Sequence, residues 1–291
     1  MDQNAAALVL REVLAPARPA HVVDIGANPI GPAPPYRGML DAGLCRVTGF
    51  EPQPAALEAL NRAKGPLETY LPWALGDGGA QTLRVCRHSG LTSTLPPDPL
   101  VLETFALLRA DAQVLEEMPV RTRRLDDLAE LEPIDFLKLD IQGGELAVLR
   151  HGRDKLRQAV VVQTEVSFAT LYQGQAGCGE IDHELRAQGF LPFCFEGIKV
   201  YDLSPVTIDH RQLAGTKQLL EADLVYVRNY FVPEALDAAQ LRQLCLIMHC
   251  CYRAYDLCMT CLLRLQELEQ VSAQGVQRYV DLLVAIGALK P

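Results

Sequence analysis

Residues 21–31 read HVVDIGANPIG, an aliphatic run followed by a turn that holds two glycines. A short aliphatic run that ends at glycine and proline is typical of a buried strand followed by a tight turn. Ligands of open parallel sheets bind beyond the carboxyl ends of the strands. We therefore expect residues 21–25 to form an inner strand and the loop after it to line a ligand site.

Outward from this strand, further aliphatic runs alternate with helical patterns, which favours an α/β fold with helices on both faces of a mainly parallel sheet. The other expected strands are residues 46–50, a part of 67–75, 82–86, 134–140, 160–165, 191–200 and 224–228. The expected helices are residues 5–15, 55–64, a helix that ends near 149, and 181–188. Residues 87–119 show no clear strand pattern.

After Pro233 the helical patterns continue without strand signals, so we expect a sheet domain over residues 1–232 and a C-terminal helical extension over 233–291. Apolar residues recur in this extension at alternating spacings of four and three, which is typical of one buried helix face. Such a seam is too long to stay exposed, so it should pack on the sheet or form a homodimer. Its members are Leu244, Met248, Cys251, Tyr255, Cys258, Leu262 and Leu265.

Cys258 and Cys261 in the extension have the two-residue spacing of a zinc knuckle. Neither glycine nor proline forms a turn between them, and the surrounding pattern is helical. Packing of small apolar thiols is therefore the favoured interpretation, and no metal site is expected.

Composition excludes several classes of protein. The 27 basic and 36 acidic residues give a net charge of −9, which opposes broad contact with nucleic acid. The most apolar long stretch, 241–265, is interrupted by charged residues, so no membrane span is expected. The N-terminus lacks the basic start and long apolar core of a secretory signal, and nine cysteines are a poor disulfide framework. We expect a cytoplasmic protein.

The glycine turn after the first strand indicates the kind of cofactor. A dinucleotide-binding loop needs a second glycine for close approach of the pyrophosphate, but Asn28 stands there and Pro29 has no amide hydrogen. Glu51, at the end of the second expected strand, can accept hydrogen bonds from vicinal ribose hydroxyls. Asp24 would place negative charge beside an amine of the ligand. These features favour a nucleoside without phosphate that carries an amino acid and a positive sulfur, S-adenosylmethionine.

Four segments together resemble the FkbM family of S-adenosylmethionine-dependent methyltransferases, in the same order and spacing. They are residues 22–28 (VVDIGAN), 50–52 (FEP), 74–77 (ALGD) and 135–145 (DFLKLDIQGGE). Residues 171–175 and 222–228 also look like later parts of that family, so the resemblance covers about residues 20–230. It implies a seven-stranded class I methyltransferase sheet of Rossmann-like type. It also implies methyl transfer to a hydroxyl oxygen of a sugar, glycan or natural product.

The sequence departs from the family pattern at two places. The glycine loop holds an extra residue around Pro29. Gln142 stands where the family commonly has Glu, so position 142 cannot act as a base.

Methyl transfer to a hydroxyl requires a group that removes the hydroxyl proton, and three candidates are expected. Asp140 ends the strand before a glycine turn, although an Asp there also suits a helix cap. Glu165 ends the next strand and would face the acceptor with a raised pKa, or else form an ordinary ion pair. His88 lies in a loop, where a solvated histidine is the competing interpretation.

The expected cofactor contacts lie at the ends of the first, second and later strands. Asp77 would accept from the adenine amino group, although Asp-Gly is also a common turn. The full set is Asp24, Gly26, Asn28, Gly31, Glu51, Asp77 and Asp140. The expected partner is a small-molecule or glycan hydroxyl acceptor.

Two other functions remain open from the sequence. A nicotinamide-dependent sugar epimerase or reductase would use the same type of sheet with phosphate-binding amides. A noncatalytic nucleoside-binding or assembly module would keep the sheet as a scaffold and use the C-terminal helices for assembly.

Overall fold

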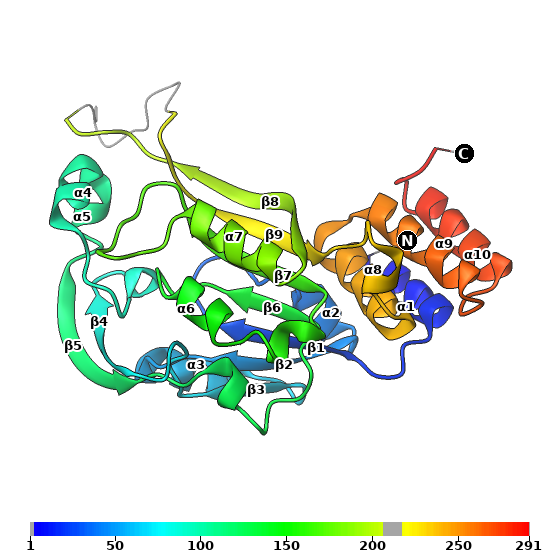
Figure 1. Ribbon diagram of the computed structural model, residues 1–291, viewed down its shortest axis with the longest axis horizontal. Coiled ribbons are helices and arrows are strands. Elements are labelled where there is room, and N and C mark those ends of the chain that lie inside the picture. Colours follow the sequence, from blue (N-terminus) through cyan, green and yellow to red (C-terminus); the bar gives the residue numbers. More distant parts are fainter. Residues whose placement is uncertain (1–2, 206–216, 291) are drawn as a thin grey trace.

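A computed structural model describes residues 3–205 and 217–290. Its centre is a seven-stranded sheet in the order β3-β2-β1-β6-β7-β9-β8 (Figure 1). The first five strands in this order, β3, β2, β1, β6 and β7, pair in parallel. Strand β9 runs antiparallel to both of its neighbours. The sheet confirms the expected α/β class and the class I methyltransferase topology. Its strands are β1 (Ala20–Ile25), β2 (Cys45–Phe50), β3 (Glu68–Leu71), β6 (Phe136–Leu139), β7 (Val161–Ser167), β8 (Phe190–Val200) and β9 (Leu219–Arg228).

Helices cover both faces of the sheet, and neighbouring residues of β1 show how the two faces differ. Val23 packs with Leu149 of α6 and Leu185 of α7 in one buried cluster. Val22 belongs to a second cluster on the other face of the sheet, which also contains residues of α1, α2, α8, α9 and α10. The helices are α1 (Gln3–Leu14), α2 (Arg37–Asp41), α3 (Pro54–Ala63), α4 (Pro99–Thr104), α5 (Ala106–Arg109), α6 (Glu145–Arg150), α7 (Cys178–Ala187), α8 (Ala238–Tyr252), α9 (Tyr255–Glu267) and α10 (Ala273–Ala285).

The region without a clear strand pattern contains a strand that the sequence analysis missed. Strand β5 (Val114–Arg121) pairs antiparallel with β4 (Ala80–Cys86), which was expected as a strand, to form a separate two-stranded sheet. No residue of β5 is buried. Because neither of its faces enters the core, β5 lacks the aliphatic run that identifies the strands of the main sheet.

The C-terminal helices pack on the sheet, which was one of the two arrangements expected for the apolar seam. Leu244 of α8 and Leu265 of α9 lie in the same buried cluster as Val22 and Val161 of the sheet. Helix α1, far away in sequence, packs against α8 and α10 and lies in the same layer (Figure 1). Since this seam is buried within one chain, it gives no reason to expect a dimer.

The cysteines of this layer are part of its core. Cys245, Cys258 and Cys261 are each at most 1% exposed. The Cys258 thiol donates to the backbone oxygen of Cys245 at 3.2 Å. Across residues 3–205 and 217–290, no group of three or more His, Cys, Asp or Glu residues is arranged to hold a metal ion. In the same part of the chain, no helix is both long and apolar enough to span a bilayer.

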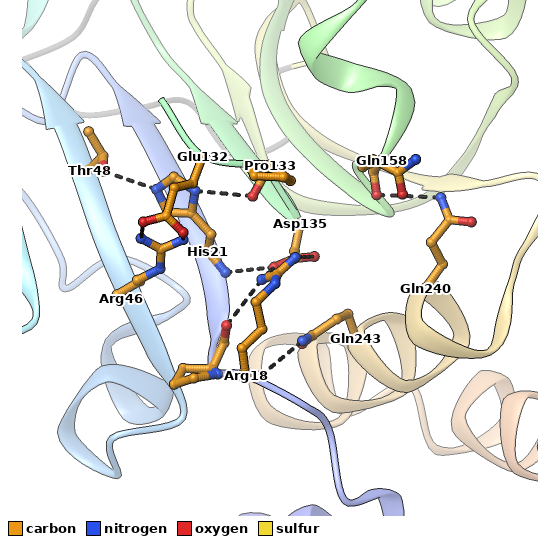
Figure 2. A network of polar contacts seen from close by, with 11 residues as sticks. Arg18, His21, Arg46, Thr48, Glu132, Pro133, Asp135, Gln158, Gln240 and Gln243 are labelled. Atoms are coloured by element: carbon orange, nitrogen blue, oxygen red, sulfur yellow. Dashed lines mark hydrogen bonds and ion pairs between the residues drawn. The ribbon is translucent and has the colours of Figure 1, made fainter. Parts of the chain in front are cut away.

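A polar network ties the helical layer to the amino ends of the strands (Figure 2). The Asp135 carboxylate accepts hydrogen bonds from the His21 backbone at 2.7 Å and from the Arg18 guanidinium at 3.0 Å. Gln243 of α8 donates to the backbone oxygen of Arg18 at 3.2 Å. Burial, followed by the nearby Arg46 charge, lowers the pKa of His21. This junction fixes α8 against the sheet at the end remote from the glycine turn.

Two successive rows of residues cross the sheet on the α8 face. Val22, Phe136 and Val161 are register partners on β1, β6 and β7, and all three are buried under the helices. The row two positions further toward the carboxyl ends holds Asp24, Lys138 and Gln163. Helix α2 has only five residues. The helical cover therefore gives way to a cavity over the polar row.

Candidate active site

A cavity of about 850 Å³ lies at the carboxyl ends of β1, β2 and β6 and extends over the polar row of the sheet. Seven of the nine residues predicted for the site line this cavity. The predicted residues that line it are Asp24, Gly26, Asn28, Gly31, Glu51, His88 and Asp140. Glu165 and Asp77 are not among the lining residues.

The Gly26 turn joins the ends of three strands. Gly26 has φ +83°, and a Cβ atom there would lie 1.8 Å from the backbone oxygen of Asp140. Its amide donates to the backbone oxygen of Phe50 at 3.0 Å. Only glycine fits this position, because both the left-handed conformation and the contact with β6 exclude a side chain. The turn therefore holds Asp140 close to the ends of β1 and β2.

Glu51 is the buried acid of the cofactor half of the cavity. It is 1% exposed and accepts a hydrogen bond from the Gln53 amide at 2.8 Å. Burial raises the pKa of Glu51 to about 7, although the Gln53 amide works against this shift. A buried carboxyl with this pKa is suited to accept hydrogen bonds from ligand hydroxyls in its ionised form.

Two loops meet beside Glu51. The Asn28 side chain donates to the Ser89 hydroxyl at 3.2 Å, and the Thr92 hydroxyl donates to Gln53 at 3.3 Å. The predicted cofactor contact Asn28 thus also joins the loop after β1 to residues 88–92. His88 lies in the second loop as an exposed residue on the cavity lining.

Asp24 lines the cavity, but its chemistry differs from the expectation. The Tyr36 hydroxyl donates to Oδ2 at 2.5 Å, and the Lys138 ammonium lies 3.1 Å from Oδ1. Burial lowers the pKa of Lys138, but the Asp24 and Asp140 carboxylates outweigh it and the net shift is upward. Asp24 therefore does not present an unpaired negative charge to a ligand amine, because the chain supplies its own cation 114 positions away.

Asp140 is available to the cavity because another acid holds the loop after β6. The Glu145 carboxylate accepts from the amides of Ile141 at 2.9 Å and of Gly143 at 2.8 Å. Helix α6 starts with Gly144 at its N-cap and has no side-chain cap. The structure thus excludes the alternative in which Asp140 caps this helix.

Gln142 connects the two acids predicted to act on the acceptor. Its Nε2 donates to Asp140 Oδ1 at 2.9 Å and to Glu165 Oε2 at 2.6 Å. The Tyr172 hydroxyl contacts its Oε1 at 3.1 Å. Gln142 is 7% exposed with φ +59°, a left-handed conformation that is costly for a residue with a side chain. The amide that cannot act as a base thus holds two carboxylates in place.

Glu165 sits behind this amide. Burial, followed by the charges of Asp140 and Glu221, raises the pKa of Glu165 well above its usual range. The Lys199 ammonium lies 3.5 Å from Glu165 Oε1, so the ion pair considered from the sequence is present at the edge of contact. Glu165 does not line the cavity itself but contacts Gln142, which does.

Asp77 is exposed and its carboxylate binds its own turn. Oδ1 accepts from the Gly79 amide at 2.8 Å and from the Thr122 hydroxyl at 3.2 Å. These contacts, the Gly79 amide first, lower the pKa of Asp77. The structure therefore shows Asp77 in the expected turn role, and its contact with adenine stays a prediction.

Several lining residues had no predicted role. They lie on the α8 side of the cavity and comprise Lys138, Gln163, Glu196, Lys199, Glu221, Asp223 and Cys251. Glu221 and Asp223 alternate along β9, so both face the same side of the sheet, as Gln163 and Glu165 do on β7. The missed signal was this period-two recurrence of polar residues in strands that are otherwise aliphatic.

Comparison with known proteins gives a family match. The model of the methyltransferase FkbM domain matches residues 24–192. The 2-O-methyltransferase NoeI of Sinorhizobium fredii (strain NBRC 101917 / NGR234) is 29% identical over 144 residues, which cover 43% of this chain and 55% of that protein. The chain thus spans about half the length of this curated relative.

Two solved structures show weaker likeness. The magnesium protoporphyrin IX methyltransferase (ChlM) of Synechocystis PCC 6803 with bound SAM is 13% identical, with a TM-score of 0.37 over 78% of this chain and 79% of that one. The precorrin-6y C5,15-methyltransferase of Geobacter metallireducens GS-15 is 12% identical, with a TM-score of 0.35 over 76% of this chain and 87% of that one.

Proposed function

The chain belongs to the methyltransferase FkbM domain family, and on that premise we propose that it transfers a methyl group from S-adenosylmethionine to a hydroxyl oxygen of a sugar or glycan. The observation that carries this proposal is the placement of Glu51 beside the Gly26 turn, at adjacent strand ends in the wall of one cavity. The name of the related 2-O-methyltransferase supports oxygen as the atom that accepts the methyl group.

The residues of the cofactor half fit this donor. Glu51 is placed to accept hydrogen bonds from vicinal ribose hydroxyls. Trp73 lines the cavity and stacks on Phe50 with ring centroids 6.0 Å apart, which provides an apolar wall for a nucleobase. Pro29 has no amide hydrogen, and the Asn28 side chain is already bonded to Ser89. A phosphate-free nucleoside therefore suits this loop better than the pyrophosphate of a nicotinamide cofactor.

When bound, S-adenosylmethionine supplies an electrophilic methyl carbon on a positively charged sulfur. The acceptor oxygen forms a bond to this carbon as the carbon–sulfur bond breaks, and the hydroxyl proton must leave. Asp140 is the proposed proton acceptor, because it lines the cavity beside the Gly26 turn and Gln142 holds its Oδ1. Glu165 supports Asp140 through the same amide, and His88 is the remaining candidate, on the loop that borders the cavity.

Transfer of label tests the proposal. The purified chain is incubated with methyl-tritiated S-adenosylmethionine and carbohydrate fractions of cell extracts. We expect base-stable label in a sugar product that is heavier by one methylene, and a rate at least about 100-fold lower for Asp140→Asn. Base-labile label, or label on nitrogen, would contradict O-methylation of a sugar.

A further inference from the structure

The end of helix α8 reaches into the cavity. Tyr252 is the last residue of α8, and its hydroxyl donates to Gln163 Oε1 at 2.8 Å. Its ring packs edge-on against Phe136 with centroids 6.1 Å apart, and the preceding residue Cys251 lines the cavity. The C-terminal helical layer therefore contributes Cys251 to the cavity wall, and Tyr252 contacts Gln163 of that wall.

Gln163 lies next to Asp223, an acid of the cavity wall. Gln163 of β7 pairs with Val225 of β9, so Asp223, two positions along β9, is its diagonal neighbour on the same face of the sheet, and both side chains line the cavity. Because Oε1 of Gln163 accepts from the Tyr252 hydroxyl, its Nε2 is the group left to donate to the Asp223 carboxylate. Tyr252, 89 residues further along the chain, thus sets the direction of this amide.

Asp223 lies on β9, opposite Glu165 of β7 and Gly197 of β8 in the sheet register. Burial and the Asp140 charge raise the pKa of Asp223, while Lys199, Lys138 and the Gln163 side chain lower it.

Asp223 faces the cavity on the side away from Glu51 and the glycine turn. Its position, like those of Lys199 and Tyr252, lies beyond residue 192, where the family match ends. The donor half of the cavity therefore comes from the matched region, whereas much of the other half comes from the later chain.

We propose that Tyr252, Gln163 and Asp223 form a relay through which the C-terminal helical layer orients the acceptor. The Asp223 carboxylate receives a hydrogen bond from an acceptor hydroxyl, and Gln163 and Tyr252 are positioning residues that set the direction of that carboxylate. This inference rests on the proposed function for the identity of the acceptor as a hydroxyl compound. It assigns part of the acceptor specificity to Asp223 and Tyr252, which lie outside the matched domain.

The relay can be tested without knowledge of the acceptor, by titrating Asp223 in protein labelled with ¹³C at the aspartate carboxyl. The Asp223→Asn variant assigns the resonance. In Tyr252→Phe the ring contact with Phe136 remains, but the amide of Gln163 loses its fixed direction. We expect the pKa of Asp223 to rise by about half a unit, because a hydrogen bond to its ionised form is weakened. Gln163→Met, which removes the donor with little change in volume, should raise it further.

Tyr279→Phe is the matched control, since its hydroxyl contacts the ring of His249 at 3.2 Å within the same helical layer and does not line the cavity. This variant should leave the Asp223 titration unchanged. An identical Asp223 titration in wild type, Tyr252→Phe and Gln163→Met would overturn the relay.

The second readout separates acceptor from donor, with the sugar fraction that takes up label in the experiment above as the probe. For Tyr252→Phe we expect the KM for this fraction to rise roughly five- to tenfold, as for one lost hydrogen bond, with unchanged affinity for S-adenosylhomocysteine. Weaker S-adenosylhomocysteine binding with an unchanged acceptor KM would overturn the inference. If the wild type bound no S-adenosylhomocysteine, the proposed function itself would fail.

Discussion

The Lys138 ammonium lies 3.1 Å from the Asp24 carboxylate, at paired register positions of β6 and β1. This ion pair belongs to the polar row of the sheet, two positions nearer the carboxyl ends of the strands than the apolar row that the helices cover. It lies in the cavity wall, and it pairs the negative charge that the sequence analysis expected beside a ligand amine. Asp24 holds Lys138 and Tyr36 in place, and its contact with the donor stays a prediction.

The pair predicts a large asymmetry between single and double substitutions. Lys138→Met should lower the free energy of unfolding by about 3 kcal/mol, because it leaves Asp24 buried without a counter-ion. Adding Asp24→Asn to Lys138→Met removes the unpaired charge and should recover more than half of the loss. Urea denaturation measures both values. Equal losses in the single and double variants would show that the charge of Asp24 is not the cause.

Two glycines of the same loop form a matched pair for a second prediction. A Cβ atom at Gly26 would clash with backbone, whereas one at Gly31 would meet nothing within 4 Å, and both glycines have positive φ. Gly31→Ala should therefore cost only the conformational strain, about 1 kcal/mol. Gly26→Ala should cost at least about 3 kcal/mol and abolish donor binding, since the ends of β1 and β6 must separate. Similar unfolding midpoints for the two variants would disprove this account of the turn.

The pKa of Glu51, about 7, predicts how donor binding depends on pH. Ribose hydroxyls donate to the ionised carboxylate, so affinity should fall as the pH drops through 7. If only the ionised form binds, the Kd of S-adenosylhomocysteine should be about tenfold higher at pH 6 than at pH 8. Glu51→Gln should bind more weakly and lose this dependence. Calorimetry at the two pH values decides, and a wild-type Kd that is constant between them would rule out Glu51 as the ribose ligand.

Gln142 offers a prediction about the acids around it. Gln142→Glu removes the amide donor shared by Asp140 and Glu165 and adds a third carboxyl beside them. Repulsion and burial should raise the folded-state pKa of Glu165 and of the introduced carboxyl above their unfolded values, so the stability of the variant should fall as the pH rises through the raised values. The destabilisation relative to wild type should therefore be larger at pH 8 than at pH 6. A deficit that is the same at both pH values would contradict the role of Gln142 as a neutral bridge.

The sequence predicted those elements and residues that can be recognised from a short stretch of neighbouring residues. Strands such as β1 were recognisable because both Val22 and Val23 are buried, one on each face of the sheet. Gly26 and Glu51 were recognisable because a turn or an acid at a strand end has few other roles. Strand β5 was missed because none of its residues is buried.

The parts of the site that escaped prediction depend on pairing across long stretches of chain. The contact of Asp24 with Lys138 follows from the register of two strands 114 residues apart, and that of Gln163 with Tyr252 from the packing of α8. Spacing along the chain carries no information on either contact. The role of Asp140 was left open between capping and the site until the position of Glu145 was known.

Isothermal titration calorimetry with S-adenosylhomocysteine and NAD, on the wild type and on Glu51→Ala, tests the central claim most directly. The account predicts that S-adenosylhomocysteine binds the wild type at one site per chain, that Glu51→Ala weakens this binding by at least about tenfold, and that NAD gives no binding heat. Binding of NAD in preference to S-adenosylhomocysteine, or an S-adenosylhomocysteine affinity indifferent to Glu51→Ala, would contradict it.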